Sequence, residues 1–240
     1  MKQFYFLLLI GISIVSAQVQ PTTSEKIDES LIAKQAMDAN SLVKNIPLKN
    51  VGPSVMSGRV VDLAVNDNNP TEYYVAYASG GLWYTNNNGN TFTPVMDETQ
   101  TQNLGDIAVH WQSGTIWAGT GENNSSRSSY AGIGILKSTD KGKTWQHMGL
   151  SDSHHIGRII VNPDNANEVT VGVTGHLYSP NKERGIYKTT DGGKTWKKTL
   201  FIDDNTGIID VAVSPNNYQM QYAAAWQKDR KAWNFSGSGE

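Results

Sequence analysis

Residues 189–196 read TTDGGKTW, and related stretches occur twice earlier in this 240-residue chain. The pattern appears as STDKGKTW at residues 138–145 and, in a weaker form, as TNNNGNTF at residues 85–92. The starts of the three copies lie 53 and 51 residues apart. A regular period of about fifty residues indicates one supersecondary unit repeated along the chain, rather than a single core wound once.

Each copy, which we call a box turn, has the chemistry of a hairpin turn. An Asp or Asn that can hydrogen-bond nearby backbone amides precedes a Gly that is free to take a positive φ. The aromatic residue that ends the copy re-enters a strand, where a tryptophan indole can cover the turn, and we expect both indoles to be largely buried. We therefore assign structural roles to Asn87, Asp140, Trp145, Asp191 and Trp196. The pattern resembles the Asp-box repeat of sialidases, sortilins and related β-propellers.

Four strands are expected in each repeat. Near-continuous apolar runs, typical of strands covered on both faces, predict the first strands at residues 60–65, 104–109, 156–161 and 208–213. Second strands are expected at residues 73–78, 115–119, 169–173 and 222–226, and third strands at 82–85, 134–138 and 185–189. Fourth strands begin at Phe92, Trp145 and Trp196. This pattern predicts an all-β protein, a β-propeller of four-stranded blades with three full blades and part of a fourth.

The start of the chain is typical of an exported protein. Residues 1–17 combine Lys2, an apolar run and the small residue Ala17, which predicts a cleaved signal peptide. The apolar run is shorter than the roughly 20 residues that span a bilayer, so a membrane anchor is disfavoured. We interpret residues 18–40 as a poorly ordered linker and residues 41–240 as the N-terminal part of a propeller that continues beyond the chain end. A further strand is expected at residues 41–48.

The composition narrows the classes of partner. The net charge is −2 and only 18% of residues are charged, so the sequence has no basic footprint for a nucleic acid. The chain has no cysteine, so disulfides do not stabilise it despite export. This combination favours a secreted, periplasmic or cell-surface bacterial protein.

Outside the box turns, four stretches resemble a bacterial family. They are residues 50–59, residues 119–124 with Arg127, residues 155–158 and residues 223–226. The family consists of large secreted Asp-box (BNR) repeat proteins with a sortilin-type N-terminal propeller, often labelled glycosyl hydrolases by similarity. The resemblance covers residues 45–240. It implies an extracytoplasmic propeller followed by further domains, and it implies no settled activity.

Propeller connectivity predicts where a ligand binds. Loops that join second to third strands, or one blade to the next, lie at one end of the blades, and the box turns lie at the other. We call the first end the loop face. Asn, Ser and Arg side chains there can bond sugar hydroxyls, peptide backbone or a carboxylate. The candidate ligand-binding residues are Arg59, Glu122, Asn123, Asn124, Arg127 and His155.

Two further groups of polar residues have both functional and structural interpretations. Asp152, His154 and His155 can supply a base or metal ligands, but neighbouring histidines on an extended segment point to opposite sides, so we expect no metal site and no cofactor. Asp62, Asp106, Arg158 and Asp210 occupy one aligned position. They form either a ring of charges around the axis or pairs between neighbouring blades.

Two function classes remain open. The favoured one is a binding propeller for extracellular peptide, protein or glycan. The alternative is a carbohydrate-active hydrolase with catalytic residues partly in missing blades. A sialidase is disfavoured because the chain has only five arginines and no Arg-Ile-Pro before a box turn. Propeller glycosidases that cleave xyloglucan need two carboxylates. They resemble residues 79–84, but carry an acid where this chain has Ala78 and Ser79.

Overall fold

The computed structural model describes residues 20–46 and 58–238 and consists of four antiparallel sheets and one long helix. The expected signal peptide, residues 1–17, lies outside the described residues, as do residues 50–57 of the first family-like stretch. The first sheet contains β1 (Val60–Val65), β2 (Tyr73–Tyr77), β3 (Gly81–Thr85) and β4 (Thr93–Pro94). The second contains β5 (Leu104–His110), β6 (Thr115–Thr120), β7 (Ile135–Ser138) and β8 (Gln146–His147).

The third sheet contains β9 (Ile156–Asn162), β10 (Asn165–Val173), β11 (Gly185–Thr189) and β12 (Lys197–Leu200). The fourth contains β13 (Thr206–Ser214), β14 (Asn217–Lys231) and β15 (Asn234–Ser238). In each sheet the strands pair in chain order, which is the arrangement of a propeller blade. The all-β prediction of three full blades and part of a fourth is confirmed.

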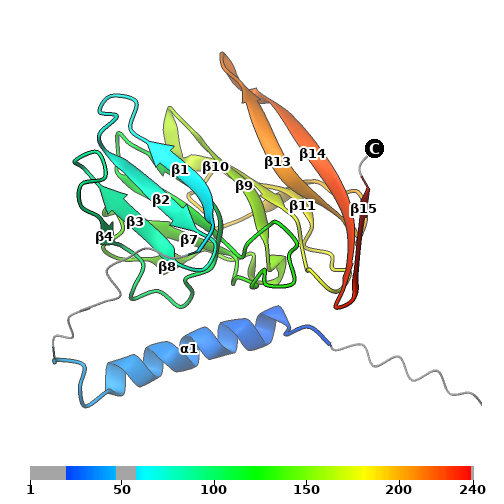
Figure 1. Cartoon of the computed structure of the whole chain (residues 1–240), viewed down its shortest axis with the longest axis horizontal. Coiled ribbons are helices and arrows are strands. Elements are labelled where there is room, and N and C mark those ends of the chain that lie inside the picture. Colours follow the sequence, from blue (N-terminus) through cyan, green and yellow to red (C-terminus); the bar gives the residue numbers. More distant parts are fainter. Residues whose placement is uncertain (1–19, 47–57, 239–240) are drawn as a thin grey trace, which may run out of the picture.

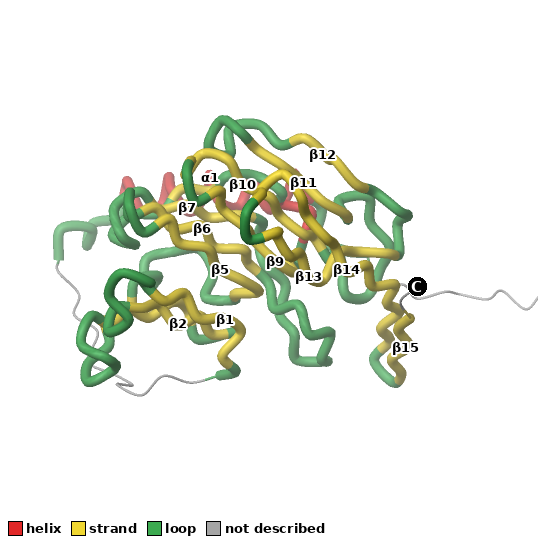
Figure 2. Tube along the Cα trace, turned by 90° about the horizontal axis from the view of Figure 1, so that it is seen from above, coloured by secondary structure: helices red, strands yellow, loops and turns green. Residues whose placement is uncertain are grey.

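The blades fan out around an arc, with the first strand of each blade innermost. β1 lies beside β5, β5 beside β9, and β9 beside β13. Figure 2 shows these four inner strands following one another along the arc. The apolar core therefore lies between blades. One cluster around Tyr74, Leu104 and Ile116 joins the first two blades, and another around Trp117 and Ile156 joins the second and third.

The box turns form the hydrogen bonds that their sequence requires. In the second copy, Asp140 accepts from the Thr144 amide at 2.8 Å, and the Ser138 hydroxyl accepts from the Gly142 amide at 2.8 Å. In the third copy, the Asp191 carboxylate accepts from the Thr195 amide at 3.0 Å. The first copy uses an amide oxygen instead, because Asn87 accepts from the Thr91 amide at 3.0 Å.

The indoles of Trp145 and Trp196 are half-buried rather than largely buried. Each one lies against the preceding blade, where its ring nitrogen donates to a backbone carbonyl. Trp145 donates to Val95 at 2.7 Å and Trp196 to Met148 at 2.6 Å. The indoles therefore join neighbouring blades while each remains partly exposed to solvent.

The aligned charges pair neighbouring blades. The Asp62 carboxylate accepts from the Ile107 amide at 3.3 Å, and Asp106 accepts from the Ile159 amide at 2.6 Å, so an aspartate in one blade holds the inner strand of the next. Arg158 then donates to Asp106 at 2.8 Å and to Asp210 at 2.7 Å. Burial and the nearby Asp62 raise the pKa of Asp106 well above its ordinary value.

The segment before the blades contains helix α1 (Ser24–Asn40), which has no buried residue. Residues 42–46 form turns, so the strand expected from residue 41 onward is wrong over its described part. α1 runs along one end of the blades (Figure 1), and its Asp28 accepts a hydrogen bond from Ser151 at 2.7 Å. Ser151 belongs to a short 3₁₀ helix, η1 (Ser151–Ser153), in the loop between the second and third blades. The helix therefore lies on the loop face.

Candidate functional site

The loop face carries a pocket of about 1120 Å³, which we call the loop-face pocket. Its walls come from the loops of the second and third blades, from the β14–β15 turn and from residues 20 and 21 just before α1. Three aromatic, three histidine and three cationic side chains line it: Tyr130, Tyr178, Trp233, His154, His155, His176, Arg127, Arg230 and Lys231. Among the described residues, no Asp or Glu lines it.

The three aromatic side chains are unusually accessible. Tyr130 is 58% exposed, Tyr178 51% and Trp233 83%, and all three border the same cavity. Large aromatic side chains normally bury their rings, so three exposed rings around one pocket make this surface a candidate binding site.

Two of the expected ligand-binding residues form an ion pair in which only the carboxylate is buried. The guanidinium of Arg59 binds the Glu122 carboxylate through two hydrogen bonds. Glu122 is only 1% exposed, whereas Arg59 is half exposed. The backbone carbonyl of Glu122 also lies 2.7 Å from Nδ1 of His155, which is buried. The structure thus brings Arg59, Glu122 and His155 together, but the Glu122 carboxylate is already occupied by Arg59.

The remaining expected residues, Asn123, Asn124 and Arg127, lie in the loop after β6. Asn123 donates to the Gly157 carbonyl of the next blade at 3.0 Å, and Asn124 accepts from Ser126 and Ser129 within its own loop. Both amides therefore shape the loop. Arg127 is exposed and lines the loop-face pocket, as does His155. Of the six residues, these two are the ones whose side chains border the cavity.

The loop after β10 adds His176 to Asp152 and His154, which the sequence already indicated. Nε2 of His176 lies 3.0 Å from Oδ1 of Asp152, and its Nδ1 lies 2.9 Å from the Ser179 hydroxyl. The ring of His154 stacks on that of His176, with 3.6 Å between centroids. Asn181 donates to the Asp152 carbonyl at 2.9 Å and fixes it from the other side.

A buried arginine holds this loop in place. Arg184 is 1% exposed and donates to four backbone carbonyls: those of Thr174, His176, Ser179 and Asn205. Burial lowers the pKa of Arg184 to about 10, so it remains charged at neutral pH. The four bonds fix both ends of the loop that carries His176.

Burial shifts several titratable groups near this cluster. It lowers the pKa of His154 to about 4 and lowers that of His155 well below its ordinary value, so both rings are neutral at neutral pH. Burial also lowers the pKa of Lys228 to about 7 and raises that of Glu183 to about 7. Shifted pKa values of this kind concentrate at functional sites, although buried structural groups show them too.

His154 has an unusual backbone conformation, with φ of 53° and ψ of −39°. Non-glycine residues rarely adopt positive φ, and such positions often lie at binding sites. At His154 the segment is therefore not extended, contrary to the expectation from the sequence: the rings of His154 and His155 meet edge to face, with 6.4 Å between centroids, and both line the loop-face pocket. Sequence reasoning missed His176. The available signal was the Thr-Gly pair at residues 174–175, which matches the pair before Glu122.

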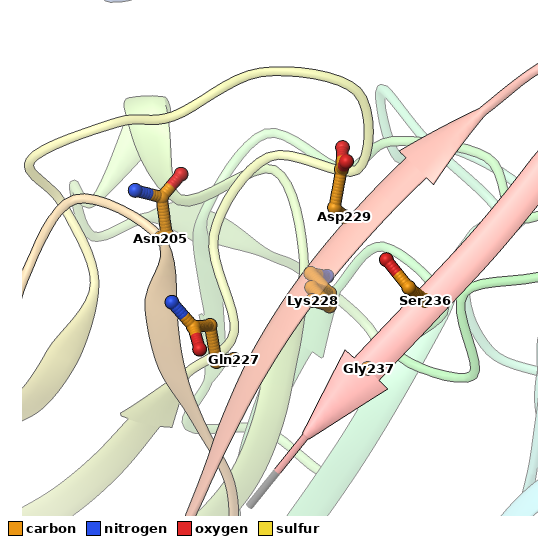
Figure 3. Close-up of a pocket in the computed structure, with 6 residues that line it drawn as sticks. All are labelled: Asn205, Gln227, Lys228, Asp229, Ser236 and Gly237. Atoms are coloured by element: carbon orange, nitrogen blue, oxygen red, sulfur yellow. The ribbon is translucent and has the colours of Figure 1, made fainter.

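A second, smaller pocket of about 390 Å³ lies on the fourth blade. Figure 3 shows its polar side chains, which come from β14, from β15 and from Asn205 just before β13. Lys228 lies in its floor, only 5% exposed, with its amine 3.4 Å from the Gly175 carbonyl. No aromatic ring is among the described residues that line this pocket, so the loop-face pocket is the better candidate for a functional site.

Comparison with known proteins supports the fold. No protein-family model matches the chain, and no curated protein does. Among solved structures, an ancestral GH74 enzyme is 26% identical with a TM-score of 0.53, over 70% of this chain and 22% of that one. A GH74 enzyme from Niastella koreensis is 23% identical with a TM-score of 0.50, over 70% of this chain and 24% of that one.

An auxiliary nutrient binding protein from Bacteroides thetaiotaomicron is 11% identical with a TM-score of 0.50, over 74% of this chain and 40% of that one. The chain therefore spans about a quarter of the GH74 enzymes and less than half of the nutrient binding protein. The GH74 enzymes are β-propeller proteins, so their similarity confirms the propeller fold and shows a likeness to glycosyl hydrolases. In the described part of the chain, no helix has both the length and the apolar character needed to cross a membrane.

Proposed function

We propose that this chain is part of an extracytoplasmic binding propeller that holds an anionic peptide or glycan in the loop-face pocket. The observation that carries the proposal is the composition of the pocket wall, which combines exposed aromatic rings with cations and contains no carboxylate among its described residues. The signal peptide expected at residues 1–17 supports a location outside the cytoplasm.

The aromatic rings supply the apolar part of the binding energy. Tyr130, Tyr178 and Trp233 present flat faces, on which sugar rings or peptide side chains can stack. Because the rings are exposed in the free protein, a bound ligand removes their apolar surface from water. Each Å² so removed contributes roughly 25 cal/mol.

The cations supply the preference for negative charge. Arg127 comes from the second blade, whereas Arg230 and Lys231 come from the β14–β15 hairpin, so the positive groups surround the cavity. Nε of Arg230 is buried and has no hydrogen-bond partner within the described structure. Guanidinium groups bind carboxylates through two parallel hydrogen bonds, which favours an acidic peptide or a uronic-acid glycan.

Hydrolysis is the second candidate, because the ancestral GH74 enzyme is similar to this chain. A glycosidase needs two carboxylates beside the scissile bond. Asp152 and Glu183 lie near the histidine cluster, and the raised pKa of Glu183 would suit a general acid, but neither side chain lines the pocket. Binding is therefore favoured over hydrolysis for the residues that the structure describes.

Isothermal titration calorimetry tests the proposal. The probes are an oligogalacturonide and an Asp/Glu-rich peptide, each paired with a neutral counterpart: a cello-oligosaccharide and the Asn/Gln form of the peptide. We expect measurable affinity for at least one anionic probe, weakened at high salt because screening acts on exposed charges. Arg127→Ala should weaken it, whereas Lys194→Ala on the box-turn end should not.

Two results would contradict the proposal. One is equal affinity for a charged probe and its neutral counterpart, which would remove the role of the cations. The other is loss of binding in Lys194→Ala with none in Arg127→Ala, which would place the site on the opposite end. Release of reducing sugar from the oligosaccharides would instead favour the hydrolase.

A further inference from the structure

Three potential metal ligands converge at the wall of the loop-face pocket. Asp152, His154 and His176 each offer one ligand atom, and these atoms all lie within 4.8 Å of one another. Two come from the loop between the second and third blades, and His176 comes from the loop after β10. His176 is buried, while the other two are half-buried. Two imidazoles and one carboxylate form a ligand set typical of zinc and other first-row transition metals.

The surroundings orient two of the three ligands. The Ser179 hydroxyl lies 2.9 Å from Nδ1 of His176, which leaves Nε2 directed at Asp152. The Asn181 amide donates to Asp152, and its own carbonyl oxygen accepts from the His176 backbone at 3.0 Å. Partners of this kind fix the orientation of metal-binding histidines and carboxylates. Arg184, through its bonds to the loop carbonyls, keeps the whole arrangement rigid.

We propose that Asp152, His154 and His176 bind a divalent transition-metal ion, with at least one coordination position facing the loop-face pocket. His154 and His176 both line that pocket, so the ion would be accessible to solvent or to a bound ligand. Three protein ligands with an open position are the arrangement of metal sites that interact with a ligand or a water molecule. This proposal does not depend on which organic ligand the loop-face pocket binds.

One rearrangement is required. The rings of His154 and His176 stack with only 22° between their planes, and ring nitrogens bind metals in the plane of the ring. The His154 ring must therefore turn toward the Asp152 carboxylate, and the cavity in front of it provides the space. In the structure, the Asp152 carboxylate instead accepts a hydrogen bond from Nε2 of His176 at 3.0 Å, and the ion would take the place of that proton.

Zinc binding to the full chain, made without a polyhistidine tag and stripped with a chelator, tests the inference. We expect one Zn²⁺ per chain by calorimetry and by elemental analysis after dialysis. Co²⁺ should bind at the same place and give a visible absorption band, while Mg²⁺ and Ca²⁺ should not compete, because they prefer oxygen ligands.

Three variants locate the ion. His154→Gly removes a ligand but keeps the fold, because Gly tolerates the φ of 53° at this position, and it should abolish stoichiometric binding. Ser179→Ala leaves all three ligands in place and should weaken zinc binding roughly 10–100-fold. His147→Ala is the control, since its ring is half-buried, lies outside the proposed site and bonds the Ile133 carbonyl at 2.6 Å.

The zinc measurements on these variants distinguish results that support the metal site from results that overturn it. Loss of zinc and of the Co²⁺ band in His154→Gly, with both retained in His147→Ala, supports the site. Absence of stoichiometric zinc in the unaltered chain overturns it, and so does retention in His154→Gly at an unchanged melting temperature. Because no organic ligand is present, none of these results depends on the proposed peptide or glycan binding.

Discussion

Replacement of Trp196 by alanine should show that the box-turn tryptophans hold neighbouring blades together. The indole nitrogen donates to the Met148 carbonyl of the preceding blade at 2.6 Å, and the ring meets that of Trp117 edge to face at 6.2 Å. A fully buried Trp→Ala change costs roughly 3–5 kcal/mol. Because the ring is half-buried, its packing contributes less, about 2 kcal/mol, and the lost hydrogen bond adds about 1 kcal/mol.

We therefore expect Trp196→Ala to lower the free energy of unfolding by about 3 kcal/mol, which lowers the melting temperature of a domain this size by roughly 6–12 °C. Trp196→Phe keeps one aromatic ring but loses the N–H donor and part of the indole, so it should cost more than the roughly 1 kcal/mol of the hydrogen bond and less than Trp196→Ala. Trp233→Ala is the matched control, because that indole is 83% exposed and should change stability by less than about 0.5 kcal/mol.

The assay is urea denaturation followed by circular dichroism, with the slope against urea checked for constancy among the variants. If Trp196→Ala destabilises the protein no more than Trp233→Ala does, the indole does not join the blades. If Trp196→Phe costs as much as Trp196→Ala, the hydrogen bond alone accounts for the effect and the packing contribution is wrong.

Three further predictions concern the loop, the acid limit and the open sides of the arc. Arg184→Leu should cost about 3 kcal/mol, because it leaves buried carbonyls unpaired, whereas exposed Lys182→Ala should be neutral in the same urea assay. Hydrogen bonds from Thr144 lower the pKa of Asp140 to about 2, and equivalent bonds lower that of Asp191, so the ionised forms stabilise the fold. That contribution is complete above the unfolded value of about 3.9 and is lost as the pH falls through the folded values. The melting temperature should drop over this range, and Asp140→Asn with Asp191→Asn should flatten the drop; an unchanged slope would argue against it. Leu63 on β1 and Tyr222 on β14 are 54% and 63% exposed at the two open sides of the arc, so the chain should self-associate in sedimentation velocity. Leu63→Lys with Tyr222→Lys should reduce this self-association. A monomer with a sharp thermal transition would contradict the prediction.

The regular part of the fold was predictable because its signals are local. The apolar run at residues 60–65 became β1 (Val60–Val65) with the same bounds, and the third strand expected at residues 185–189 became β11 (Gly185–Thr189). The turn chemistry of Asp140 was equally local, since donor and acceptor lie four residues apart. The repeat period and the turn residues together were therefore enough to predict the blades without knowledge of any long-range contact.

The site was less predictable because it depends on contacts between loops far apart in the sequence. Glu122 was expected to meet a ligand, but Arg59 reaches it from 63 residues away and occupies its carboxylate. His176 joins Asp152 across 24 residues, and no single loop shows that pairing. The extension of β14 to Lys231 is a further example, since its hairpin brings Trp233 into the pocket wall.

The indole N–H signal of Trp233 tests the central claim most directly. The chain has seven tryptophans, and Trp233→Phe assigns the signal of this one in a proton–nitrogen NMR spectrum. During titration with the oligogalacturonide or the acidic peptide, we predict a saturable shift of the Trp233 signal, while those of Trp145 and Trp196 at the opposite end stay in place. A shift confined to Trp145 and Trp196, or no saturable shift with either probe, would contradict binding in the loop-face pocket.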